Sequence, residues 1–110
     1  MSDPSTTLLV HAAIARLVGD DPLAPVILAA IAMEHPESFA VHAALALVIE
    51  SFDEALVYAQ QLASDRRERQ HLAIVTSYLH GDYPRTSLLA REHLAEFPDD
   101  IVVSWLAAKL

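Results

Sequence analysis

Six histidines among 110 residues are the side chains in this sequence that most readily suggest metal binding or acid–base chemistry. Imidazole is a common metal ligand, and it titrates near neutral pH. Glu68 and His71 stand three residues apart, a spacing that puts a carboxylate and an imidazole on one face of a helix. Metal sites in helical bundles use such pairs, but they need a second pair and further carboxylates on facing helices.

The sequence contains no second pair of this kind. The other histidines fall on different predicted helices or turns, and they are His11, His35, His42, His80 and His93. We therefore predict no metal site and no cofactor.

Nucleophilic catalysis also lacks a recognisable motif. Cysteine is absent, which excludes thiolate chemistry and disulfides. Ser77, Ser87 and Ser104 have no neighbouring histidine-and-acid arrangement, and none lies in a strained nucleophile turn. The sequence therefore predicts a protein that is not an enzyme.

Composition indicates helices that pack into a single domain over residues 1–110. Hydrophobic residues make up 54% of the chain and glycine occurs only twice, which favours close-packed helices. A formal net charge of −8 would repel phosphate backbones and anionic lipids, so we expect neither nucleic acid nor membrane as a partner. The sequence shows no membrane span or signal peptide, so we expect a cytoplasmic protein.

Capping signals divide the chain into seven predicted helices. Glycine is expected to end the first helix at Gly19, and capping boxes are expected at Ser51 with Glu54 and at Asp65 with Glu68. The predicted helices cover residues 4–18, 21–34, 37–49, 52–63, 66–80, 83–96 and 101–110.

An internal repeat supports this division. A shift of 62 residues aligns 19–22 with 81–84 and 35–37 with 97–99, which is two repeat lengths. The middle unit keeps 52–55, the start of its second helix, but it lacks the glycine turn. The chain is therefore expected to contain three related helix pairs and one further helix.

These landmarks resemble the tetratricopeptide repeat, a unit of roughly 34 residues with a Gly-Asp-Tyr turn, an early alanine in its second helix and a closing proline. The matching residues here are Gly19, Pro36, Ala55, Gly81, Asp82, Tyr83 and Pro98, whereas Thr86 stands where alanine is usual. The resemblance implies an all-α fold of antiparallel helix hairpins. It further implies about three repeats plus a C-terminal helix, in a right-handed superhelix.

A longer resemblance covers residues 38–110. The stretches 67–73, 79–84 and 97–100 look like the N-terminal repeats of the tetratricopeptide repeat protein 38 family. Members of that family are longer, so the resemblance implies that this chain corresponds to their opening portion. It adds a fold expectation and little about function.

In such arrays the first helix of each hairpin lines a concave groove. Tyr78 and Trp105 are the kind of side chain that anchors a peptide interface, although Trp105 could equally pack as core. The predicted partner-binding residues are Arg16, Glu68, His71, Tyr78, Val102, Trp105, Leu106 and Lys109, with Glu37, Ala40 and Val75 also expected in the groove.

We therefore expect a non-catalytic interaction module, a scaffold or adaptor that binds a protein or peptide. The helix at 101–110 is almost entirely apolar and lacks the second half of its hairpin, so one side is expected to be uncovered within the chain. Burial of that side against a second copy would give a homodimer. The alternatives are a small-molecule or enzymatic role in a groove lined by His71, Tyr78 and Trp105, or an N-terminal piece of a longer protein.

Overall fold

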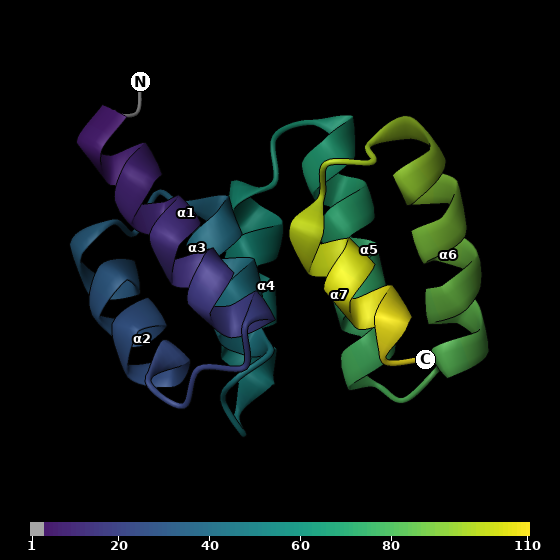
Figure 1. The fold of residues 1–110 in the computed structure, drawn as a ribbon, viewed down its shortest axis with the longest axis horizontal. Helices are drawn as coiled ribbons and strands as arrows, with labels where there is room; N and C mark the ends of the chain where they lie inside the picture. The colour runs from purple at the N-terminus through teal and green to yellow at the C-terminus, as the bar shows by residue number, and fades with distance from the viewer. Residues whose placement is uncertain (1–3) are drawn as a thin grey trace.

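Seven α-helices make up most of residues 4–110, the part of the chain that the computed structural model describes, and no β-strand occurs there (Figure 1). The helices are α1 (Pro4–Val18), α2 (Ala24–Glu34), α3 (Phe39–Ala46), α4 (Phe52–Leu62), α5 (Arg66–Leu79), α6 (Tyr83–Glu96) and α7 (Ile101–Ala108). The predicted all-α class is confirmed. Within these residues, no helix combines the length and apolarity that a bilayer crossing needs.

Short polar side chains fix the starts of four helices. Each accepts a hydrogen bond from the backbone N–H three residues further on, which satisfies a donor that the helix itself leaves free. These N-cap residues are Ser38, Asp65, Asp82 and Asp100. Such a cap stabilises a helix by about 1 kcal/mol.

The starts of α2 and α4 differ from the prediction. The carboxylate of Asp21 accepts from the N–H of Leu23 and its carbonyl from the N–H of Ala24, so a turn precedes α2 and the helix begins at Ala24. The predicted capping box at Ser51 is wrong, because that side chain makes no cap hydrogen bond.

The turns after α1 and α5 are the same motif, in which one residue takes a left-handed conformation. After α5 this residue is Gly81 (φ 78°), and the N–H of Asp82 bonds back to the carbonyl of Ser77. After α1 it is Asp20 (φ 57°) rather than Gly19, and the N–H of Asp21 bonds back to the carbonyl of Arg16. Helix α1 therefore ends at Val18, directly before Gly19 as predicted, but Asp20 takes the left-handed conformation.

Substitution of Gly81 by valine is expected to lower the free energy of unfolding by about 1–3 kcal/mol, because a β-branched residue resists positive φ. A Cβ atom at this position would meet nothing within 4 Å, so the cost is conformational rather than steric. Urea unfolding measures this loss of stability. Asparagine tolerates the left-handed region, so Gly81→Asn is the matched control and should cost less. Equal losses for the two variants would contradict this explanation.

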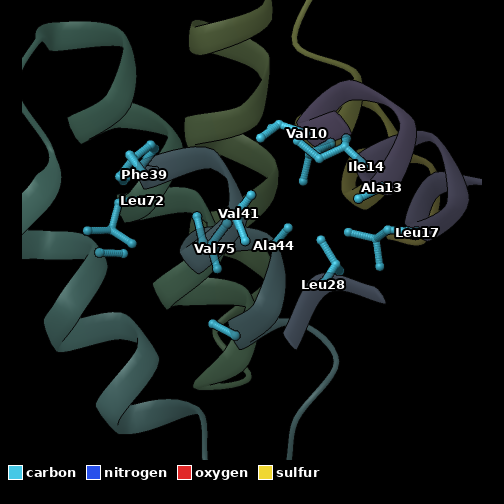
Figure 2. Packing of buried hydrophobic residues seen from close by; sticks show 14 of the residues in the cluster. Val10, Ala13, Ile14, Leu17, Leu28, Phe39, Val41, Ala44, Leu72 and Val75 are labelled. Atoms are coloured by element: carbon cyan, nitrogen blue, oxygen red, sulfur yellow. The ribbon is translucent and has the colours of Figure 1, made fainter. Parts of the chain in front are cut away.

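The odd-numbered helices form an inner layer. Contacts join α1 to α3, α3 to α5, α5 to α7, and α7 back to α1, while α2, α4 and α6 pack on the outside against their neighbours in sequence (Figure 1). Figure 2 shows side chains from α1, α2, α3 and α5 in one continuous core, from Leu17 and Leu28 to Val41 and Val75. Six of the eight residues of α3 are buried, which fits a helix that is apolar on all sides.

Helix α7 is covered on more than one side. It packs against α5 and α6, and it also contacts α1. Val102, Val103 and Leu106 are buried, and Trp105 is half-buried. The prediction that one side of this helix has no cover within the chain is wrong, because the inner layer closes on itself. The predicted homodimer loses that physical reason, although self-association itself stays a prediction.

Candidate functional site

A groove of about 540 Å³ opens where α1, α3, α5 and the start of α7 meet. Its walls are apolar and its rim is charged. The apolar lining consists of Val10, Ile14, Phe39, Ala40, Ile101 and Val102, and the polar lining of His11, Asp65, Arg67, Glu68, His71, Asp99 and Asp100. All four inner helices therefore contribute to one surface.

Three polar side chains meet at the base of this groove, half-buried His71 and buried His93 and Asp100, and we call them the Asp100 cluster. The Asp100 Oδ2 atom lies 2.8 Å from His71 Nδ1 and 2.8 Å from His93 Nε2. The side chains are 12%, 1% and 7% exposed for His71, His93 and Asp100 respectively. One carboxylate oxygen thus joins two imidazoles out of contact with most solvent.

Burial by itself raises the pKa of Asp100, because it penalises the charged form. The hydrogen bond from His71, the charge of His71, and the hydrogen bonds from His93 and the Val103 N–H act in the opposite direction and outweigh it. The pKa of this carboxyl therefore lies well below its ordinary value, and Asp100 is ionised at neutral pH.

Local structure explains why the three residues meet. Asp100 is the N-cap of α7, and its Oδ1 accepts from the Val103 N–H at 3.3 Å, which fixes the carboxylate in the loop before that helix. His93 lies in the last turn of α6, against the ring of Phe97 (centroids 5.1 Å apart). His71 lies on α5, and its ring makes an edge-to-face contact with the ring of Phe39 (centroids 5.8 Å apart). The cluster therefore ties α5, α6 and α7 together.

The second nitrogen of the His93 ring also has a partner. His93 Nδ1 lies 2.8 Å from Gln70 Oε1. Both ring nitrogens of a nearly inaccessible histidine are therefore within hydrogen-bond distance of an oxygen atom. A neutral imidazole carries a single N–H, so a neutral His93 ring can donate a hydrogen bond to only one of these two oxygen atoms.

Part of the predicted partner-binding set lines the groove. Glu68, His71 and Val102 are there, as is the expected Ala40. The carboxylate of Glu68 accepts from the backbone N–H and hydroxyl of Ser64. Glu68, His71 and Ala40 are half-buried and keep some surface toward the groove, whereas Val102 is buried and offers a partner almost none.

The aromatic part of the prediction falls elsewhere. Tyr78, Trp105 and Lys109 line a separate hollow of about 330 Å³, where the Lys109 ammonium lies 4.3 Å from the centre of the Trp105 ring. A single groove lined by His71, Tyr78 and Trp105 is therefore wrong. The physical reason is that Tyr78 lies about two turns along α5 from His71.

The remaining predicted residues lie outside the groove. Arg16 is exposed and forms an ion pair with Asp21 at 2.7 Å. Leu106 and the expected groove residue Val75 are fully buried in the core, so neither is available to a partner. Glu37 is exposed beside His35, at 3.4 Å between its carboxylate and the ring.

Comparisons with protein-family models, curated proteins and solved structures find no match to this chain. The resemblance to tetratricopeptide proteins therefore rests on the residues that carry it in the sequence.

Sequence reasoning missed His93 and Asp100 as partners of His71, although a signal was present. His71 and His93 each stand eleven residues from Asp82, at the turn between their helices. Because α5 and α6 pack against one another on either side of this turn, residues at equal distances from it come side by side. Spacing within one helix does not show such a pair, because it forms across a hairpin.

Proposed function

We propose that this protein is a non-catalytic interaction module, a cytoplasmic scaffold or adaptor that holds a segment of a partner polypeptide in the inner groove. The observation that carries the proposal is the groove itself, with apolar walls from three helices and a charged rim. Interfaces combine these two features, because apolar contact supplies affinity and the polar rim supplies specificity.

The helix pairs are proposed to be tetratricopeptide-like repeats in a short right-handed stack. The left-handed turns at Asp20 and Gly81 support this, since they end the first helices of two pairs in the same way. In such repeats the first helices carry the binding face, and here the groove is lined by α1, α3, α5 and α7.

The charges of the rim indicate the chemistry of the proposed partner segment. Asp65 and Glu68 carry negative charge there, whereas the guanidinium of Arg67 and the carboxylate of Asp99 pair with each other at 3.2 Å. The whole chain has a formal net charge of −8. We therefore propose a segment with apolar side chains and at least one lysine or arginine, because complementary charge speeds association and rejects acidic competitors.

A larger hollow, about 980 Å³, lies between α4, α5 and α6, but it is a weaker candidate. Its lining mixes both signs of charge, from Asp53 and Asp82 to Arg69 and Arg85, without a buried polar group comparable to the Asp100 cluster. Of these two hollows, only the inner groove combines apolar walls with such a cluster.

The substitution Ile101→Lys tests the groove. Ile101 is 49% exposed and lies at the start of α7, so the change removes apolar contact and repels a basic segment while it leaves the core intact. Peptides selected from a random display library on the wild-type protein should be apolar and basic. Their affinity, measured by fluorescence polarisation, should fall about tenfold or more in the variant, the effect of about 1.4 kcal/mol or more.

Leu88→Lys is the matched control, because Leu88 is 53% exposed on α6 and does not line the groove. Its affinity for the selected peptides should equal that of the wild type. Equal affinities for both variants, or selected peptides without basic residues, would count against the proposed groove.

A further inference from the structure

We propose that His71, His93 and Asp100 bind a divalent transition-metal ion of the zinc type. The ligand atoms would be His71 Nδ1, His93 Nε2 and Asp100 Oδ2, which lie within 4.8 Å of one another. Two imidazoles and one carboxylate suit Zn²⁺, Co²⁺ or Fe²⁺, whereas Mg²⁺ and Ca²⁺ prefer oxygen ligands. Metal binding here does not require the proposed peptide binding, although His71 and Asp100 also line that groove.

The hydrogen-bond requirements of His93 give the first argument. If Gln70 Oε1 accepts from His93 Nδ1, then Nε2 of a neutral ring carries a lone pair. That lone pair faces an oxygen atom of the Asp100 carboxyl group at 2.8 Å, and two acceptors this close repel one another. A cation between them removes the repulsion, and a metal ion is one such cation.

The surroundings of the ligands give the second argument. Histidines that bind metals commonly donate their other N–H to an oxygen, which orients the ring. Gln70 Oε1 is placed to accept from His93 in this way. The second oxygen of Asp100 is held by the Val103 N–H, which leaves Oδ2 for the metal. Two of the three ligands are therefore held in place from outside the site.

The groove supplies a route and a fourth ligand position. His71 and Asp100 both line it, so an ion can reach them, and water or a group of a bound molecule can complete the coordination. Tetrahedral bonds of about 2.0–2.1 Å separate neighbouring ligand atoms by roughly 3.3 Å. The present separations of 2.8 Å must therefore widen by roughly half an ångström, a movement that side-chain rotation allows.

The competing explanation is a purely structural network. A flipped Gln70 amide would donate to His93 Nδ1, and His93 Nε2–H would then donate to Asp100 without any metal. A doubly protonated His93 ring would also satisfy both oxygen atoms. In either case the cluster would only join helices.

Titration of the chelator-treated full chain with Zn²⁺ and Co²⁺ separates these explanations. We expect one ion per chain by calorimetry, the visible absorption of four-coordinate Co²⁺, and a higher melting temperature with Zn²⁺. His71→Gln should weaken binding by about 10–100-fold or more, since loss of an outer partner alone has that effect. His42→Gln is the matched control and should bind normally, because buried His42 donates instead toward the carbonyl of Pro36 at 3.2 Å.

Nitrogen-15 chemical shifts of the wild-type histidines give a readout that does not depend on the folding of a variant. Zn²⁺ should shift His71 Nδ1 and His93 Nε2 and leave His42 unchanged. Absence of these shifts at saturating Zn²⁺, or equal affinity of the wild type and a folded His71→Gln variant, would overturn the proposed site.

Discussion

Replacement of Asp100 by alanine is expected to lower the free energy of unfolding by about 3–5 kcal/mol, the usual result of removing one partner from a buried charged network. The change leaves His71 Nδ1 and His93 Nε2 without their common acceptor. It also removes the N-cap of α7, since Asp100 Oδ1 accepts from the Val103 N–H. Urea unfolding followed by circular dichroism, in the presence of chelator, measures the loss.

The matched control is Asp82→Ala. Asp82 is the exposed N-cap of α6 and accepts from the Arg85 N–H, so its removal should cost only about 1 kcal/mol. Asp100→Asn keeps the shape of the side chain but loses its charge, and it should fall between the two. Similar losses for Asp100→Ala and Asp82→Ala would mean that the two histidines add nothing to stability.

Replacement of Leu106 by alanine is expected to lower the free energy of unfolding by about 2–5 kcal/mol, because it leaves a cavity in a fully buried part of the core. Leu106 belongs to α7, which packs against α1, α5 and α6. Thermal and urea unfolding measure the loss. The molecular mass of the protein measured by light scattering should not change, since a side chain without exposed surface cannot contact a second copy of the chain.

Leu88→Ala serves as the control for this change, since Leu88 is largely exposed and its truncation should alter stability by no more than about 0.5 kcal/mol. A change in mass on Leu106→Ala, without loss of stability, would restore the sequence-based prediction that this helix self-associates.

Helix positions could be predicted from the sequence because local chemistry determines them. The turn residues around Gly81 and the cap at Asp82 place α6 at Tyr83–Glu96, the predicted range. The predicted start of α2 is less accurate, because the Asp21 side chain and Pro22 form a turn there. Such a turn is a local alternative that competes with helix formation. Likewise, Asp20 rather than Gly19 takes the left-handed conformation, which the spacing of glycines alone does not distinguish.

The candidate site was only half predictable. Glu68 and His71 share a helix face, so their spacing in the sequence identifies them as candidate site residues. His93 and Asp100 join them through the packing of α5 against α6 and the loop before α7, and this depends on tertiary structure. The packing of α1 against α7 also depends on tertiary structure, because no local sequence pattern shows that the first and last helices of an array are in contact.

The contact between α1 and α7 has a consequence for cooperativity. In an open array each repeat touches only its neighbours, so the ends can fray while the middle persists. Here the first and last helices pack together, and the Lys109 ammonium lies 3.8 Å from the Asp20 carboxylate in the turn after α1. Loss of either end therefore withdraws support from the other. The chain is consequently expected to unfold as one unit, with its two ends among the parts that must assemble together during folding.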